Sequence, residues 1–141
     1  MAILNTGIYS YRPVSPESLY SLAGWVRDNN IPNPIPSSSL HCTVINSSNK
    51  FLGYIVDSTP VTVHPFSFSM EMMNTALAVV FQSSTLQKQH DFAISMGATH
   101  EYQTFHPHIS LSYAIPLDFP LWNLKPPFFQ IDLDPEQYNV S

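Results

Sequence analysis

Two short stretches decide how this chain folds: His41-Cys42-Thr43-Val44-Ile45-Asn46 and His108-Ile109-Ser110-Leu111-Ser112-Tyr113. Each begins with a histidine, has a small hydroxyl residue two positions later, and continues as an apolar or strand-forming run. On a β-strand, residues i and i+2 point to the same face. Each stretch is therefore expected to present one imidazole and one hydroxyl to the same surface. Two such strands side by side would place two imidazoles and two hydroxyls around one small volume.

An acid, a base and two hydrogen-bond donors are the groups that metal-free cleavage of a phosphodiester needs. We therefore name His41, Thr43, His108 and Ser110 as candidate catalytic residues, and we expect no metal and no cofactor. A metal cluster of His100, His106 and His108 is disfavoured because acids and cysteines are missing nearby and Pro107 interrupts the strand. The single cysteine, Cys42, excludes an internal disulfide and a cysteine-rich zinc site.

The composition predicts one globular domain, residues 1–141, with 44% hydrophobic and only 11% charged residues. Five Lys and Arg residues are scattered along the chain, and the formal net charge is −5. Proteins that bind long nucleic acids usually carry a basic stripe, so we expect a small nucleotide partner and no long nucleic acid. No apolar run is long enough for a membrane span, and the N-terminus does not resemble a signal peptide, so a cytoplasmic location is expected.

The order strand, helix, loop, strand is predicted twice. Residues 7–11 form a strand, Ser15 and Pro16 begin a helix that continues to Arg27, and residues 41–46 form the next strand. In the second unit, residues 76–82 form a strand, a helix capped by Ser83 or Ser84 follows and stops near Gly97, and a strand begins at His108. We interpret this order as two pseudo-symmetric halves, about 1–58 and 59–141. Further strands are predicted over 61–70 and 128–133, and the tail 134–141 is predicted to be a lid or a frayed end.

In these two motifs and the spacing between them, the chain resembles the 2H phosphoesterase superfamily, which is named for two His-x-Thr/Ser motifs. The resemblance implies an α+β fold that is bilobal with pseudo-two-fold symmetry, in which two antiparallel sheets line a central cleft and helices cover the outside. Within the superfamily, the short length, the opening residues 7–11 and the string 102–113 are similar to those of the phage anti-CBASS nucleases. That similarity implies cleavage of small cyclic oligonucleotide messengers of bacterial antiphage signalling. Ser110 stands where many relatives have Thr, and it keeps the hydroxyl donor.

Five residues are candidates for binding substrate. Tyr9 and Tyr11 alternate correctly to share one strand face and could stack on bases, although packing against neighbouring residues is an equal alternative. Arg12 or Lys50 could neutralise the negative charge of a phosphate. The alternative for each is a position on the solvated surface. Glu136 resembles an acidic residue that contacts a base in the anti-CBASS nucleases.

The expected reaction is attack of a ribose 2′-hydroxyl on the adjacent 3′-phosphate, with one histidine as base and the other as acid. Which histidine has which role is not given by the sequence. Three alternatives stay open: a phosphodiesterase for 2′–5′ oligoadenylate or terminal 2′,3′-cyclic phosphates, a sponge that binds cyclic nucleotides without cutting them, and an RNA-processing relative. Two intact motifs argue against the sponge, and the missing basic surface argues against long RNA.

Overall fold

The computed structural model describes residues 7–48, 54–99 and 104–140, and its six-stranded sheet is built around the two predicted motif strands. The strand order is β4-β5-β6-β2-β1-β8, and every neighbouring pair is antiparallel. The motif strands β2 (His41–Ser47) and β6 (His108–Ser112) lie at its centre. Next to them are β1 (Ile8–Pro13) and β5 (Ala76–Val80). The outer strands are β4 (Ser69–Met73) and β8 (Gln137–Val140).

Both predicted helices are present, with ends that lie within two residues of the predicted ones. Helix α1 (Pro16–Asp28) starts after Ser15, whose Oγ accepts a hydrogen bond from the backbone N–H of Ser18 at 3.4 Å. Helix α2 (Ser84–Ser95) starts after Ser83, whose Oγ accepts from the N–H of Leu86 at 3.3 Å. These serines satisfy donors that the first helical turn leaves unpaired. Gly97, at φ 111°, follows α2 in a conformation that favours glycine.

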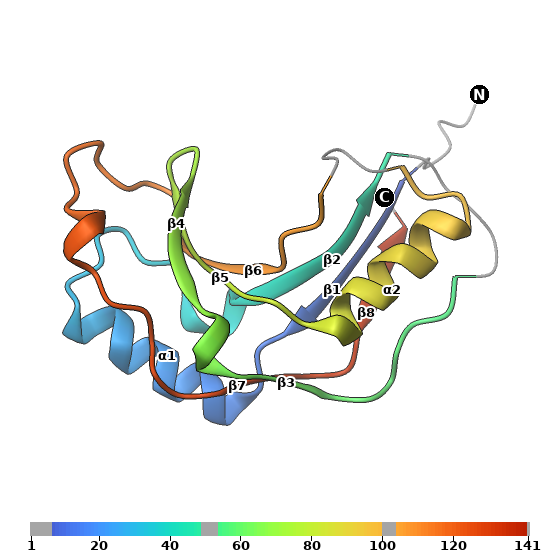
Figure 1. Ribbon diagram of the computed structural model, residues 1–141, viewed down its shortest axis with the longest axis horizontal. Coiled ribbons are helices and arrows are strands. Elements are labelled where there is room, and N and C mark those ends of the chain that lie inside the picture. The colour runs from blue at the N-terminus through green and yellow to red at the C-terminus, as the bar shows by residue number, and fades with distance from the viewer. Residues whose placement is uncertain (1–6, 49–53, 100–103, 141) are drawn as a thin grey trace.

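The two helices pack on the outside of the sheet, as the resemblance implies. Leu22 and Val26 of α1 belong to the same buried cluster as Cys42 and Val44 of β2. Ala93 of α2 packs against Ile45. Figure 1 shows the two helices at opposite ends of the bent sheet, with the β4–β5 hairpin rising at one end and β1, β2 and β8 at the other. No helix in the described ranges is long and apolar enough to cross a membrane.

Two predictions for the connecting segments are wrong. Residues 61–70 do not form one strand: β3 (Val61–Val63) pairs with β7 (Ile131–Leu133) in a separate two-stranded sheet, a 3-10 turn covers Pro65–Ser67, and β4 follows. Pro65 is the physical cause, because it lacks the N–H that would continue the ladder. The tail is neither a lid nor a frayed end, since β8 pairs with β1 at the sheet edge (Figure 1).

The α+β fold with two sheets and two outer helices is confirmed, and the structure adds how the two motif strands meet. Cys42 of β2 pairs with Ile109 of β6, so the two strand-helix-strand units share one continuous sheet. The internal duplication itself stays a prediction.

Candidate active site

The register of β2 on β6 brings the four candidate catalytic residues onto one face. Because the strands are antiparallel and Cys42 pairs with Ile109, His41 lies opposite Ser110 and Thr43 lies opposite His108. The buried spacers point into the core, and the four flanking side chains are all partly exposed on the other face. Diagonal neighbours on adjacent antiparallel strands are about 7–8 Å apart. That separation leaves room for a phosphate group between the two imidazoles.

Both histidines are held by the same hydrogen bond. Nδ1 of His41 lies 2.8 Å from the carbonyl oxygen of Ser39, and Nδ1 of His108 lies 2.8 Å from the carbonyl oxygen of His106. A carbonyl oxygen only accepts, so each Nδ1 carries the hydrogen. In the neutral form, each ring therefore has its lone pair on Nε2, where it can take up a proton.

Each motif strand also contains a β-bulge at the third residue after its histidine. In β2 the extra residue is Val44, because Ser10 pairs with Ile45 and Tyr11 with Thr43. In β6 it is Leu111, because Leu77 pairs with Ser112 and Ala78 with Ser110. Bulges bend a strand and change which way the following side chains point.

The carbonyl oxygen at each bulge has its own donor. Nδ1 of the buried His90 donates to the carbonyl of Val44 at 2.7 Å, and the N–H of Ile35 donates to the carbonyl of Leu111 at 2.9 Å. His90 also stacks on Phe105 at 4.2 Å between ring centroids. Through the first of these bonds, His90 ties α2 to the motif strand. Neither bulge nor its donor could be read from the sequence, since the partners are main-chain carbonyls that carry no residue-specific signal.

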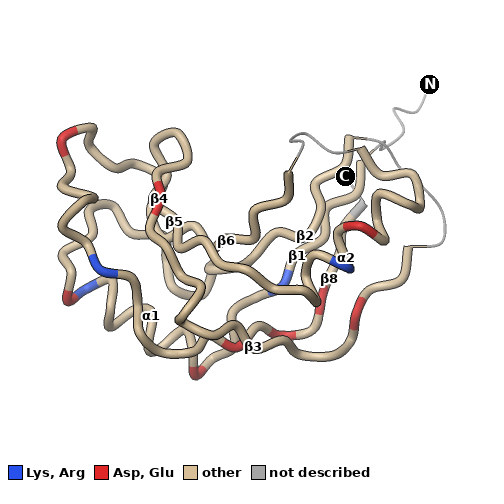
Figure 2. Tube along the Cα trace, viewed as in Figure 1, with Lys and Arg blue, Asp and Glu red and all other residues tan. Residues whose placement is uncertain are grey.

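A cavity of about 680 Å³ opens beside the motif residues. Thr43, His108 and Ser110 line one side of it, and Asn46, Asn74 and Phe105 are among the residues that line the rest. Figure 2 shows that basic residues are scattered along the described trace and do not form a stripe beside this region. A volume of this size is typical of a small-molecule site.

Tyr9 and Tyr11 share one face of β1, as predicted, and the structure places that face beside His41 and Thr43. Their rings stack at 5.3 Å between centroids, and both contact the imidazole of His41 edge-on. The Tyr9 hydroxyl is 2.8 Å from Nε2 of His41 and 2.9 Å from Oγ1 of Thr43. The Tyr11 hydroxyl instead donates to Oε1 of Gln137 at 3.2 Å. Stacking of a base on either ring stays a prediction.

The structure corrects the prediction for Arg12. Strand alternation turns its side chain to the face opposite Tyr9 and Tyr11, where it is 0% exposed. The guanidinium forms an ion pair with Asp57 at 2.6 Å and donates to the carbonyls of Thr59 and Asp134. It is a buried structural residue and has no access to a phosphate in the cleft. Lys50 and His100 lie outside the described residues.

Glu136 is also buried. Its side chain is 4% exposed, and its carboxylate accepts hydrogen bonds from the Ser10 hydroxyl, the Tyr54 hydroxyl and the N–H of Asp57. Ser10 points away from the cleft because it alternates with Tyr9 and Tyr11. The carboxylate therefore fastens β8 and the 54–57 segment to β1, and its contact with a base stays a prediction.

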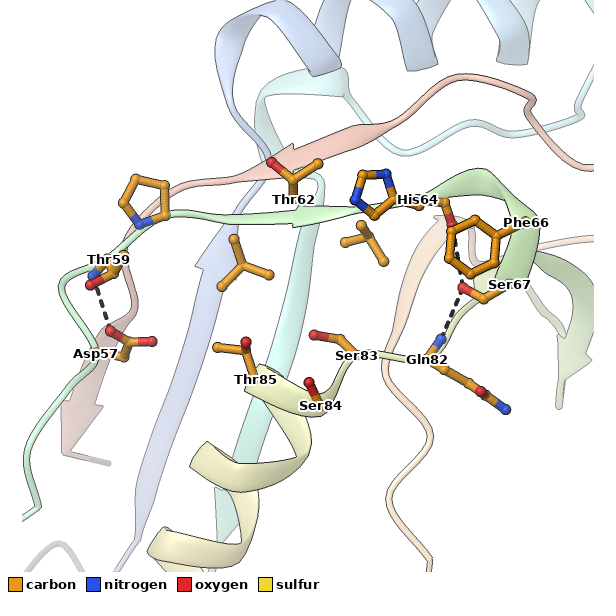
Figure 3. A pocket seen from close by; sticks show the side chains of 13 residues that line it. Asp57, Thr59, Thr62, His64, Phe66, Ser67, Gln82, Ser83, Ser84 and Thr85 are labelled. Atoms are coloured by element: carbon orange, nitrogen blue, oxygen red, sulfur yellow. Dashed lines mark hydrogen bonds between the residues drawn. The ribbon is translucent and has the colours of Figure 1, made fainter.

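A second cavity of about 550 Å³ lies between β3 and the start of α2 (Figure 3). Hydroxyl and amide side chains line much of it, together with His64 and Phe66. None of the predicted site residues takes part in it.

The comparisons with known proteins identify the family of this chain. The profile of the anti-CBASS protein Acb1 family matches residues 6–140. The anti-CBASS protein Acb1 of Enterobacteria phage T4 is 32% identical over 120 residues, which cover 82% of this chain and 78% of the T4 protein. The chain belongs to the anti-CBASS protein Acb1 family. The Acb1 protein of Salmonella phage S16 is 29% identical over 115 residues, covering 79% of this chain and 74% of that protein.

The fold of this Acb1 family member is that of the 2H phosphoesterases. Escherichia coli LigT, in a crystal structure with 3′-AMP, matches with a TM-score of 0.67 at 15% identity, over 94% of this chain and 86% of LigT. At that identity the likeness shows the shared fold alone. The family and the fold that the two motifs predicted are both confirmed.

Proposed function

We propose that this chain is a metal-independent phosphodiesterase that opens small cyclic oligonucleotides at 3′–5′ bonds. The observation that carries the proposal is the matched pair of imidazoles on one sheet face, each held through Nδ1 by the carbonyl two residues earlier. Membership of the anti-CBASS family supports a signalling nucleotide as the substrate. We propose that it acts in the cytosol of the infected cell, where such a messenger would be met.

In the proposed reaction one neutral histidine accepts the proton of a ribose 2′-hydroxyl through Nε2. The 2′-oxygen attacks the adjacent phosphorus, and the bond to the leaving 5′-oxygen breaks. The other histidine, protonated, donates to that oxygen. Histidine suits both roles because its ordinary pKa lies near neutral pH. The product is a linear oligonucleotide that ends in a 2′,3′-cyclic phosphate.

The two motif hydroxyls act on the phosphate. Thr43 lies opposite His108 and Ser110 lies opposite His41, so a phosphate between the imidazoles would have a hydroxyl on each side. Donors placed where negative charge develops stabilise the transition state in a site that excludes water. Tyr11 and the cavity of about 680 Å³ offer an aromatic surface and space for a base.

The test is product analysis by mass spectrometry in the presence of EDTA. The substrates are cyclic dinucleotides, cyclic trinucleotides, 2′–5′ oligoadenylate and nucleoside 2′,3′-cyclic phosphates, and a His41→Ala, His108→Ala double variant is the control. Linear products from the cyclic compounds, absent with the double variant, are the expected result. Cleavage of 2′–5′ bonds alone, or tight binding with no product, would overturn the proposal.

A further inference from the structure

His90 links α2 with the strand that carries the first motif. Its side chain is buried on α2, and its Nδ1–H donates to the carbonyl oxygen of Val44 at 2.7 Å. Its ring lies flat on Phe105, with 4.2 Å between the centroids and 6° between the planes. These two contacts fix both the position and the tilt of the imidazole. Because Val44 directly follows Thr43, His90 holds the backbone beside one of the two proposed phosphate donors.

The carbonyl that His90 holds belongs to the extra residue of the β2 bulge. Ser10 pairs with Ile45 and Tyr11 with Thr43, which leaves Val44 outside the regular ladder. Val44 is buried, and a buried carbonyl that loses its donor is costly. Without His90, the direct way for this carbonyl to regain a donor is for Val44 to return to the ladder. Such a shift moves one side of the bulge by one residue and turns its side chains to the other face.

The bulge in the second motif strand is held differently. There the carbonyl of Leu111 accepts from the backbone N–H of Ile35 at 2.9 Å. A main-chain donor of this kind is present with any side chain except proline. The direction of Ser110 therefore does not depend on a single donor side chain, whereas that of Thr43 depends on His90.

We propose that His90 is a positioning residue for Thr43. This inference rests on the proposed function. By holding the Val44 carbonyl outside the ladder, His90 keeps Oγ1 of Thr43 on the cleft face, where it donates to a phosphate oxygen as negative charge develops. His90 neither takes a proton from the substrate nor gives one, and its Nδ1 hydrogen stays on the carbonyl throughout. Since His90 lines the same cavity of about 680 Å³ as Thr43, the experiment must separate this role from direct contact with substrate.

Two substitutions of His90 separate the hydrogen bond from the ring. His90→Phe keeps a ring to stack on Phe105 and removes the donor, whereas His90→Asn keeps an N–H on the atom bonded to Cγ and removes the ring. On a cyclic dinucleotide, we expect His90→Phe to lower kcat about 10- to 100-fold with little change in KM, because a misplacement of about 1 Å can cost about 10²-fold. We expect His90→Asn to keep most of the rate. Equal losses in both variants, or full kcat in His90→Phe, would overturn the proposal.

A double-mutant cycle tests whether His90 acts through Thr43. Residues that act through one another have effects that do not add. In single-turnover assays with enzyme in excess, we expect His90→Phe to cost little more once Thr43→Ala is present. We expect it to keep its full factor in the Ser110→Ala background, since the second bulge has its own donor. The same factor in both backgrounds would indicate a general effect on the fold and would overturn the proposal.

Ser18→Ala is the matched control for a lost buried hydrogen bond on the other helix. Ser18 is 5% exposed on α1, and its Oγ accepts from the N–H of Asp132 on β7 at 2.8 Å. We expect this variant to keep the kcat of the unmodified protein below its unfolding temperature, and a loss equal to that of His90→Phe would overturn the proposal. His90→Leu takes the place of His90→Phe if that variant does not fold. If the unmodified protein opened no cyclic dinucleotide, the proposed function itself would have failed.

Discussion

Cys42 of β2 pairs with Ile109 of β6, and both side chains are 0% exposed. This pair joins the two strand-helix-strand units in one sheet. It also fixes the register that sets each histidine opposite the hydroxyl of the other motif. Since a shift of one residue would turn every side chain of a strand to the other face, the burial of these two spacers keeps both imidazoles in the cleft.

The first prediction concerns the four motif residues. On the proposed cyclic substrates, we expect His41→Ala and His108→Ala each to lose about 10²–10⁴-fold in rate, because each removes an acid or a base. Thr43→Ala and Ser110→Ala should lose about 10²–10³-fold, because each removes one donor to the phosphate. Steady-state kinetics check these values, and thermal unfolding shows whether the variants keep the fold. Full activity of His41→Ala would rule out the scheme.

The second prediction is that chelation leaves the rate unchanged. The proposed acid, base and phosphate donors are all protein side chains. In the described ranges, no three His, Cys, Asp or Glu residues come together in a group that could hold a metal. Rates measured with and without EDTA after dialysis should agree. Strong inhibition that added Mg²⁺ or Mn²⁺ reverses would argue for a metal-dependent reaction.

The third prediction concerns the buried ion pair of Arg12 and Asp57. Arg12→Ala leaves the Asp57 carboxylate and two carbonyls without their donor, which should lower the free energy of unfolding by about 3–5 kcal/mol. Denaturant unfolding measures this loss, and Arg27→Ala is the matched control because its side chain is 78% exposed. A loss of substrate affinity by Arg12→Ala without a loss of stability would contradict the structural role.

The fourth prediction concerns the Glu136 carboxylate. Glu136→Ala removes the common acceptor of Ser10, Tyr54 and the N–H of Asp57. Leaving such buried donors unpaired costs about 1–3 kcal/mol for each group. We expect faster hydrogen exchange of the β8 amides in this variant, because β8 would lose the carboxylate that anchors its start. Unchanged exchange together with weaker nucleotide binding would point instead to direct contact with substrate.

The fifth prediction is that Cys42 does not react in the folded protein and that stability falls in alkali. Burial raises the pKa of the Cys42 thiol from 9.0 to about 12. The folded state then holds this proton more tightly than the unfolded state does, so the contribution is complete below about pH 9 and is lost as the pH rises toward about 12. Alkylation by iodoacetamide at pH 8 should require denaturant. Rapid alkylation of the native protein would show that the thiol is accessible.

Local sequence signals were sufficient for most of the elements. Ser15 and Ser83 supply hydroxyls that satisfy the first N–H groups of their helices, and Gly97 allows a positive φ at the end of α2. The alternation in 41–43 and 108–110 predicted the face that carries the four candidate catalytic residues. The prediction of one strand over 61–70 was wrong because Pro65 lies within it. Proline has no N–H to donate to a neighbouring strand, so the strand ends there.

The sequence by itself determined the two motif strands, the helix that precedes each of them and the family resemblance, because periodicity, capping and residue type act over a few neighbouring positions. Only the tertiary structure decided that Arg12 and Glu136 are buried, that the Ser39 and His106 carbonyls hold the histidines, and that Tyr9 reaches Nε2 of His41. Those facts depend on contacts between residues far apart in the chain or on main-chain atoms that every residue shares. The residue type of a charged side chain does not tell whether it binds a phosphate or forms an internal ion pair. Only its packing in the folded chain distinguishes these two roles.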